Sequence, residues 1–523
     1  MSMNLGTSGV IIFVIYILGV LGVGIYVSRR GATTKRDYFL ADDKLPWWMI
    51  GGSILASNIS THQIVGVMGV AYSRGFVAIV IEWGAILIGF NVLLWVFLPF
   101  YLRNGFYTMP EFLKKRFGGA ARTTYSVLVL LTYIFVEIGA VLFLGAISLH
   151  GLLGIPMLTS TIIIAVFTGI YTISGGLRAV VWTEMLQICV LVVGMIALSV
   201  ATFYAAGGFS ALMATSKDWR MFLPADDPDF PWTQYLGGML CISIFYCATN
   251  QFIVQRALAA KNEWHARVGI IFAQYLKFLT PFLVVAPALV APSLFPHLAK
   301  PDLLFVTLVE HLLPSVLVGL VMAALISAVM SHLSGAINAS ATILTMDIYL
   351  SYINKNGTEA DSVRFAKISG VTVIILGILC SAVLIHHSDK PIFLYLLNAY
   401  GYFTPGIATM FLLGILWKRT THAGAMTAGL LTIPLSVFLE WFFPEISFFN
   451  RTGIVFWACM GACIAVSLIT TPKPDHELIG LIWNKESLRL LPSERHLQRG
   501  LRNPFIWWAV VTLAVLFFYI RYY

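Results

Sequence analysis

The chain has 523 residues, of which 59% are hydrophobic and only 11% are Asp, Glu, Lys or Arg. A soluble domain carries roughly 25% charged residues, so this chain, with a mean hydropathy of +0.85, has too few charges for a water-exposed surface. The composition excludes a water-soluble enzyme and predicts an all-α membrane protein. The net charge of +9 does not indicate nucleic-acid binding, because Lys and Arg gather in the cytoplasmic loops of membrane proteins.

Apolar runs bounded by Gly, Pro and charged residues predict about 14 transmembrane helices, since roughly 20 apolar residues cross a bilayer. In chain order these runs lie near residues 8–28, 46–70, 76–102, 123–149, 157–174, 184–206, 234–255, 267–292, 314–347, 364–387, 391–416, 423–441, 452–471 and 503–521. The first run lacks the features of a cleaved signal peptide and is expected to stay as a helix. An amphipathic stretch near 298–311 is expected to lie on the membrane surface.

The distribution of Lys and Arg supports this count. If residue 1 lies outside, most of the 33 basic residues fall in loops on the inner side. A miscounted helix would invert every later loop and remove this asymmetry. The sequence therefore predicts a multi-pass protein of the cell (plasma) membrane with its N- and C-termini outside. Residues 473–502, with their mixed charge, are expected to form a solvated cytoplasmic loop.

Two predicted spans contain too many polar groups to face lipid along their whole length. The second span carries the polar run from Asn58 to Gln63, and the seventh carries Ser243 and Tyr246 among other polar residues. With the first helix set aside, these are the first and sixth members of a run of ten. Two interrupted helices at equivalent positions, five helices apart, indicate an inverted repeat. In such repeats the binding site lies near the middle of the bilayer, where unwound backbone binds ions. Ser53, one turn earlier, is expected only to allow close helix packing.

Four ionisable groups stand out within the predicted spans: Glu82, Glu137, Lys277 and His332. Burying such a group costs several kcal/mol and calls for a partner or a function. Glu82 precedes Trp83, and a carboxylate beside an aromatic face suits a polyhydroxylated ring. The alternatives are a structural ion pair between Glu82 and Lys277 and interfacial anchoring for Trp83. Glu137 has no polar neighbours in sequence and is expected to brace helices.

The ninth span is interrupted by Ser331, His332 and Ser334. Ser331 and Ser334 share one helical face, and hydroxyl and carbonyl oxygens suit a hard monovalent cation. The alternative is that each serine bonds back to its own helix. Asp347, near the end of the same span, is a candidate either for cation exit or for bracing the helix end.

Several sequence blocks resemble the solute:sodium symporter family, and they occur in the family's order between about residues 10 and 472. The blocks are Gly51–Gln63, Glu82–Trp83, Gly105–Phe112, Gly175–Glu184, Asn250–Arg256, Ser340–Tyr349, Trp417–Thr421 and Gly424–Ala425. The nearest branch is that of the sodium/glucose and sodium/galactose cotransporters. The resemblance implies a LeuT-like core of 5+5 inverted-repeat helices at residues 46–416, which works by alternating access. Residues 1–45 and 417–523 would then be accessory.

The resemblance also implies a sugar site. Its predicted side chains are Gln63, Glu82, Ser243, Lys277 and Asn398, with Tyr246 stacking below the sugar as an inner gate and Tyr72 nearer the outer side. Ser243 stands where the branch usually has Asn, Asn398 where it has Gln, and Cys247 where it has Trp. Both amide changes shorten the reach of the side chain. Glucose, galactose, myo-inositol, another hexose and an acidic sugar therefore all remain open as the substrate.

A sodium site is implied in the same way. Its predicted ligands are the backbone carbonyls of Ala56, Ile59 and Ala328 and the hydroxyl of Ser331. The family's second hydroxyl is replaced by His332, and His62 stands where some members have an acid. Neutral imidazole is a poor sodium ligand, and imidazolium would repel the ion. Either His332 turns aside and sodium binds, which we favour, or protonation of His332 or His62 supplies the coupling charge.

The sequence thus predicts a symporter that couples sodium entry to uptake of a sugar or sugar-like polyol. The alternatives are a proton-coupled or sodium-independent sugar transporter and a sugar sensor that does not transport. A pump is not expected, because the chain has no phosphate-binding Gly-rich loop, and an enzyme is not expected, because it has no His-Glu-x-x-His motif and no Ser-His-Asp set. The expected partners are a small-molecule sugar or polyol, a sodium ion (H⁺ in the alternative) and the lipid bilayer, with no nucleic acid.

Overall fold

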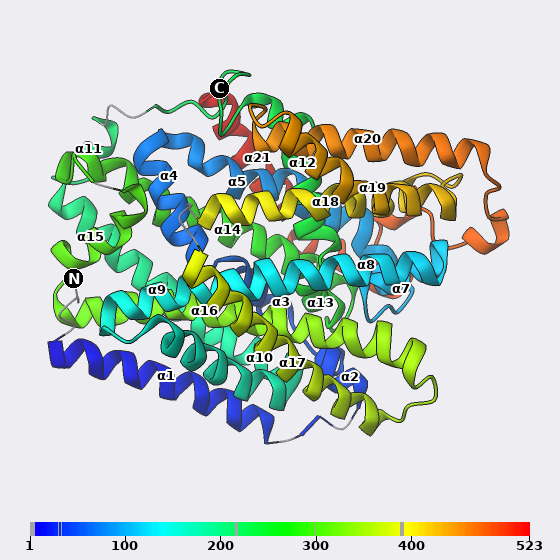
Figure 1. The fold of residues 1–523 in the computed structure, drawn as a ribbon, viewed down its shortest axis with the longest axis horizontal. Coiled ribbons are helices and arrows are strands. Elements are labelled where there is room, and N and C mark those ends of the chain that lie inside the picture. The colour runs from blue at the N-terminus through cyan, green and yellow to red at the C-terminus, as the bar shows by residue number, and fades with distance from the viewer. Residues whose placement is uncertain (1–5, 30, 33, 215–217, 299, 388–391) are drawn as a thin grey trace.

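The computed structural model describes residues 6–29, 31–32, 34–214, 218–298, 300–387 and 392–523. These residues form helices and connecting turns, with two isolated bridges and no strand among them. Most long helices run along the longest axis of the molecule, which is horizontal in Figure 1. The all-α fold predicted from composition is confirmed.

The α-helices are listed here with their bounds. They are α1 (Gly6–Ser28), α2 (Lys35–Leu40), α3 (Trp47–Asn58), α4 (Val67–Arg74), α5 (Val80–Gly84), α6 (Leu98–Arg103), α7 (Met109–Phe117), α8 (Gly119–Thr132), α9 (Val141–Leu153), α10 (Met157–Ala205), α11 (Ser210–Met213), α12 (Gly238–Ile244), α13 (Gln251–Leu258), α14 (Glu263–Leu294), α15 (Leu304–Leu312), α16 (Ser315–Ile343), α17 (Glu359–His387), α18 (Ile392–Leu416), α19 (His422–Phe442), α20 (Phe448–Ile469) and α21 (Pro504–Arg521). Segments of π-helix join several of them, including His62–Gly66, Tyr133–Ala140, Phe245–Thr249 and Leu344–Ile353.

Among the described residues, 11 helices are long and apolar enough to cross a membrane, or 12 if one bent pair is counted as a span. The predicted count of 14 therefore stays a prediction. The longest helix, α10, has 49 residues and would be about 74 Å long if it were straight, whereas the hydrocarbon core of a bilayer is roughly 30 Å thick. Gly176 divides α10 with φ 57° and ψ −153°. A Cβ there would lie 2.4 Å from the Tyr38 carbonyl oxygen, so this break requires glycine.

Both predicted interruptions are present. Helix α3 ends at Asn58, and Ile59 follows in an extended conformation with φ −83° and ψ 112°. In the other span, Asn250 has φ −80° and ψ 119°, and its side chain accepts a hydrogen bond from the Phe252 amide. The helices before and after Asn250 meet at 41°. Each break releases backbone groups from helical hydrogen bonding, which leaves them available for other partners.

The broken helices meet in the middle of the bundle. Helix α3 packs against α10, α13, α14 and α16, while α12 packs against α5, α18 and α20. Helix α16 packs against α1, α10 and α17 and is buried along most of its length. Helix α3, which ends at the first break, therefore packs against four other helices instead of lipid.

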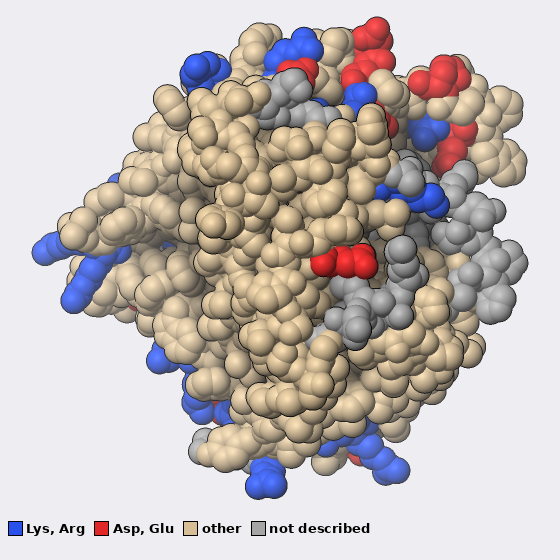
Figure 2. Space-filling model, turned by 90° about the vertical axis from the view of Figure 1, so that its left-hand side faces the viewer, with Lys and Arg blue, Asp and Glu red and all other residues tan. Residues whose placement is uncertain are grey.

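Figure 2 shows the end of the bundle at which α1 begins. Uncharged residues cover most of this end, and the Lys, Arg, Asp and Glu side chains lie mainly towards its edge. Helix α15 lies at the same end (Figure 1) and covers most of the stretch predicted at 298–311. Its apolar face is buried through Leu304, Phe305, Leu308 and Val309.

Most of residues 473–502 are exposed, as predicted, but hydrogen bonds also hold this segment against the helix bundle. The Trp483 amide donates to the Ile415 carbonyl at 2.9 Å, and the Glu494 carboxylate accepts from the Trp264 amide at 2.8 Å, in the first turn of α14. The Arg267 guanidinium donates to backbone carbonyls of the same segment. Mixed charge in the sequence indicates solvation, but it does not show which charges bind the ends of distant helices.

Candidate functional site

Three buried polar side chains meet beside the break that follows α3. The Lys277 Nζ atom, on α14, lies 2.6 Å from Glu82 Oε2 on α5 and 2.5 Å from Asn58 Oδ1 at the end of α3. None of the three is more than 2% exposed. The ion pair considered from the sequence is therefore present. Asn58 was not among the predicted site residues, although it begins the polar run that pointed to this break.

Two acceptor atoms from the predicted sugar-site residues lack a partner. Glu82 Oε1 and Gln63 Oε1 are buried, and neither has a hydrogen-bond partner among the described residues. A buried acceptor without a partner costs roughly 1–3 kcal/mol. A ligand rich in hydroxyl groups would supply donors to these two atoms.

The other predicted sugar-site residues lie on helices that adjoin this cluster. Ser243 is 4% exposed on α12, which packs against α5. The Tyr246 ring makes edge contacts with the rings of Phe252 and Tyr400, each at 6.1 Å between centroids. Asn398 lies on α18, but its side chain is outside the described residues, as is that of His62. Tyr72 donates to the Phe295 carbonyl at 2.7 Å.

Trp83 does not provide the aromatic face that its position beside Glu82 suggested. Its ring is fully buried and stacks on the Phe278 ring, with 5.3 Å between the ring centroids. The centroid of the Phe518 ring lies 4.9 Å away. Its indole nitrogen donates to the Phe278 carbonyl at 3.3 Å. Neighbouring residues on a helix point in directions about 100° apart, so Glu82 turns towards Lys277 while Trp83 turns towards α21.

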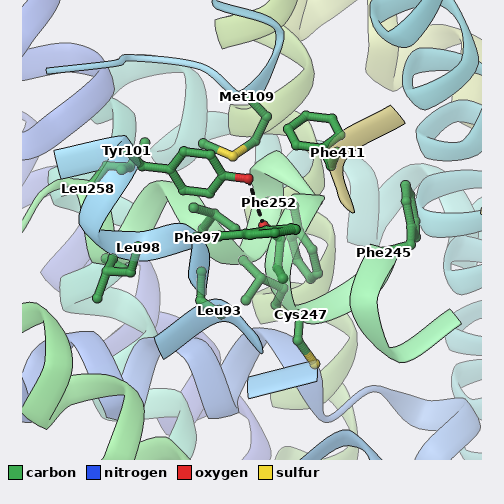
Figure 3. Close-up of a cluster of buried hydrophobic side chains, with 14 of the residues drawn as sticks. Leu93, Phe97, Leu98, Tyr101, Met109, Phe245, Cys247, Phe252, Leu258 and Phe411 are labelled. Atoms are coloured by element: carbon green, nitrogen blue, oxygen red, sulfur yellow. Dashed lines mark hydrogen bonds between the residues drawn. The ribbon is translucent and has the colours of Figure 1, made fainter. Parts of the chain in front are cut away.

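Cys247, which stands where the family resemblance places Trp, belongs to an apolar cluster. Figure 3 shows it below Phe252, with Phe97 and Leu93 beside them. The Tyr101 hydroxyl donates to the Ala248 carbonyl at 3.1 Å, which is the bond drawn in Figure 3. This packing fixes the π-helical turn before Asn250 and with it the position of Tyr246.

Three of the four predicted cation ligands, Ala56, Ala328 and Ser331, also converge. The Ser331 hydroxyl, on α16, lies 2.7 Å from the Ala56 carbonyl oxygen and 3.3 Å from that of Ala328. Ile59 lies at the break itself, where its backbone is no longer helical. Ser334 instead donates back to the Ser331 carbonyl at 2.9 Å, as expected for a serine within a helix. The arrangement brings hydroxyl and carbonyl oxygens of two helices to one point.

His332 turns away from this group of oxygens. Its Nδ1 lies 2.8 Å from the Ser57 carbonyl, and its Nε2 lies 2.5 Å from Glu137 Oε2. A carbonyl oxygen only accepts, so Nδ1 carries a hydrogen, and one proton must bridge Nε2 and Oε2. Whichever atom holds that proton, the pair has no net charge. The repulsion of a cation expected from imidazolium is therefore offset by Glu137.

Glu137, which was expected to brace helices, contacts polar partners from two of them. Its second oxygen, Oε1, accepts from the Tyr400 hydroxyl at 2.5 Å, so both oxygens are occupied. The partners lie 195 and 263 positions away in the chain, on α16 and α18. Inspection of the residues next to Glu137 in sequence gives no sign of them.

A second buried network joins α3 to α10 and α13. Arg256 Nη2 lies 2.6 Å from Glu184 Oε1, and the Ser57 hydroxyl donates to the same carboxylate at 2.5 Å. Ser53 contacts both charged groups, so the prediction that it only allows close packing is wrong. Arg256 and Glu184 are no more than 1% exposed. The network fixes the last turn of α3, immediately before the break.

We expect Glu184→Ala to destabilise the protein, because it leaves the Arg256 guanidinium buried without a counter-charge. Removing one partner of a buried ion pair costs about 3–5 kcal/mol. Thermal unfolding of the purified protein in detergent should therefore show a clear fall in melting temperature. Glu359→Ala is the control, since Glu359 is half-exposed and pairs with Lys35 at 3.3 Å, and exposed pairs contribute at most about 1 kcal/mol. Equal melting temperatures for the two variants would contradict the prediction.

Asp347 braces a helix end. Its Oδ1 accepts from Arg122 Nε at 2.6 Å and from the Thr108 hydroxyl at 3.1 Å. Of the two roles considered from the sequence, these contacts support bracing, because they tie α16 through its π-helical end to α7 and α8.

Solved transporters share this fold. A Na⁺-coupled sialic acid symporter in a substrate-bound outward-open state superposes with a TM-score of 0.80 at 22% identity, over 90% of this chain and 99% of that one. The nucleobase-cation-symport transporter Mhp1, in a closed conformation, gives 0.54 at 14% identity, over 85% and 97% of the two chains. The predicted LeuT-like architecture is confirmed by these neighbours.

Sequence comparisons agree with the fold. The chain is 34% identical to the sodium/glucose cotransporter of Vibrio parahaemolyticus, over 89% of this chain and 91% of that protein. It is 33% identical to the sodium/glucose cotransporter 1 of Oryctolagus cuniculus, over 92% of this chain and 82% of that protein. It is also 33% identical to the sodium/myo-inositol cotransporter 2 of Sus scrofa, over 84% of this chain and 71% of that protein. The model of the Sodium:solute symporter family matches residues 38–432. The chain therefore belongs to the sodium:solute symporter family.

Proposed function

We propose that this membrane protein is a secondary active symporter that couples sodium entry to the uptake of a sugar or polyol. The observation that carries the proposal is the Lys277–Glu82–Asn58 cluster, buried beside a broken helix with acceptor atoms left free. The relatives named as sodium/glucose and sodium/myo-inositol cotransporters support the same substrate class. The chemistry of such ligands matches the site, since each hydroxyl both donates and accepts.

In this proposal, Lys277 donates to a sugar oxygen, while Glu82 and Gln63 accept from sugar hydroxyls through their free oxygens. Ser243 and Asn398 complete the set of polar contacts, and Tyr246 covers one face of the ring. The ammonium already holds Glu82 and Asn58 in place, so the site needs little rearrangement to receive the ligand. Preorganisation of this kind lowers the entropic cost of binding.

Sodium would bind among the carbonyls of Ala56, Ile59 and Ala328 and the hydroxyl of Ser331. The hydroxyl now bonds to two of those carbonyls, and it would turn a lone pair to an arriving ion. The ion would join the end of α3 to α16 and stabilise the conformation with the formed sugar site, so that sugar affinity rises by a population shift. The net neutrality of the His332–Glu137 pair removes the repulsion that an imidazolium would exert on a sodium ion.

We further propose that residues 46–416 form the transport core, that residues 1–45 and 417–523 are accessory, and that both termini lie outside. This orientation rests on the asymmetry of Lys and Arg between the loops. It assigns the end of the bundle in Figure 2 to the outer side of the membrane.

Uptake by proteoliposomes tests the function. Labelled D-glucose, D-galactose and myo-inositol are offered with an inward sodium gradient, with equal sodium on both sides, and with potassium replacing sodium. We expect one of the three sugars to accumulate only under the gradient. Uptake that ignores sodium but collapses with a proton ionophore would overturn the ion assignment. Sugar binding with neither uptake nor counterflow would support a sensor instead.

A further inference from the structure

We propose that His332, Glu137 and Tyr400 form a hydrogen-bonded relay by which sodium binding raises sugar affinity. All three act as positioning residues and contact neither ligand. The inference rests on the proposed function and adds to it the route between the two sites.

The relay is a continuous chain of contacts. It starts at the Ser57 carbonyl, which binds His332 Nδ1 at 2.8 Å, continues from Nε2 to Glu137 at 2.5 Å, and ends with the Tyr400 hydroxyl on Glu137 at 2.5 Å. His332 and Glu137 are at most 1% exposed, and Tyr400 is 7% exposed. Four elements are joined in this way: α3, α16, the π-helical segment Tyr133–Ala140, and α18.

One end of the relay adjoins the proposed sodium ligands. Ser57 follows Ala56 in the last turn of α3, and His332 follows Ser331 on α16. Sodium bound between Ala56 and Ser331 would fix the distance between these two helices. The His332 ring spans the same gap, so its position depends on that distance.

The other end adjoins the proposed sugar contacts. Tyr400 lies two residues after Asn398 on α18, and its ring contacts the ring of Tyr246. Movement of α18 would therefore move both the Asn398 backbone and the aromatic contact of Tyr246. The relay thus connects the helix gap at the sodium site to two of the residues proposed to hold the sugar.

Apolar packing would join these helices at lower cost than buried polar groups. A buried carboxyl and imidazole pay a large desolvation penalty, and hydrogen bonding is strongly directional. Because both Glu137 oxygens are occupied, a shift of α16 or α18 would break a bond in a site that water does not reach. A network of this kind favours discrete arrangements over continuous ones, which is what coupling between two sites requires.

The relay is tested by measuring the coupling factor, which is the ratio of sugar Kd without sodium to sugar Kd with saturating sodium. The probe is tritiated D-glucose, D-galactose or myo-inositol, whichever the wild type takes up, bound to the purified full chain with potassium or sodium in the buffer. Coupling factors in proteins are typically about 5–150. We expect Tyr400→Phe to lower this factor at least about fivefold and to leave the sodium-free Kd within about twofold of the wild-type value.

Two further variants show whether the hydrogen bonds are responsible. Glu137→Gln keeps an acceptor for Tyr400 and a donor for His332 Nε2, so we expect it to retain most of the coupling factor. Tyr38→Phe removes another buried tyrosine hydroxyl, which donates to the Ile173 carbonyl at 3.0 Å, and should leave the factor unchanged. Thermal unfolding of each variant provides the check that it is folded.

The outcomes separate the relay from the proposed function. An unchanged coupling factor in Tyr400→Phe would overturn the relay and leave the symporter intact. A Tyr400→Phe variant that weakens sugar binding equally with and without sodium would also overturn it, because a merely structural role has that effect. A wild-type coupling factor of one for all three sugars would overturn the proposed function, and the relay with it.

Discussion

Replacing Lys277 by alanine is expected to reduce sodium-driven sugar uptake at least about a hundredfold. The substitution removes a donor to the sugar and leaves the Glu82 carboxylate buried without its counter-charge, 2.6 Å from where the ammonium lay. Breaking a buried pair from one side costs about 3–5 kcal/mol of folding free energy. Losing the charged donor to the sugar costs about 1.5–3 kcal/mol of binding free energy, and each 1.4 kcal/mol is about a factor of ten. Initial rates of uptake into proteoliposomes under an inward sodium gradient measure the loss.

A double variant separates sugar binding from structural support. Glu82→Ala combined with Lys277→Ala leaves no unpaired charge, so we expect its melting temperature to recover towards that of the wild type. Uptake should not recover, because both polar contacts to the sugar are gone. If the double variant regains both stability and uptake, the ion pair is structural only and the sugar site lies elsewhere.

Replacing Ser331 by alanine is expected to raise the sodium concentration for half-maximal uptake at least about tenfold. The hydroxyl is the one side-chain oxygen in the proposed ligand set. An oxygen that contacts a charged partner contributes about 1.5–3 kcal/mol to the binding free energy. At saturating sodium the maximal rate should stay close to that of the wild type, since the sugar contacts are unchanged. Sodium titrations of uptake at a fixed sugar concentration give both quantities.

Ser340→Ala is the matched control for this variant. Ser340 is also buried on α16, and its hydroxyl donates to the Ala336 carbonyl of the same helix at 2.8 Å. We expect its sodium dependence to equal that of the wild type. A common shift in both variants would mean that loss of any serine hydroxyl on α16 disturbs the helix, and it would contradict the assignment of Ser331 as a sodium ligand.

The sequence predicted those features of the fold that depend on the composition of a short stretch of chain. Charge is too scarce for a soluble surface, and the run from Asn58 to Gln63 is too polar for an uninterrupted lipid-facing helix. Both broken helices follow from such runs, since backbone-competing side chains within a few residues disfavour regular helix. The pairing of Glu82 with Lys277 was one of the alternatives that the sequence left open, because buried charges are usually paired.

Tertiary structure alone decided which way each side chain faces and what it meets there. Trp83 turns into an aromatic cluster with the C-terminal helix, Ser53 joins Glu184 and Arg256, and Glu137 binds His332 and Tyr400. Their partners come from elements more than a hundred positions away in the chain, so no local pattern encodes them. The sequence by itself determined that the membrane-spanning helices break at two polar runs. Only the packing of the bundle decided that the imidazole beside the proposed ion site would be neutralised by a carboxyl group, because close packing brings distant charges together where water cannot screen them.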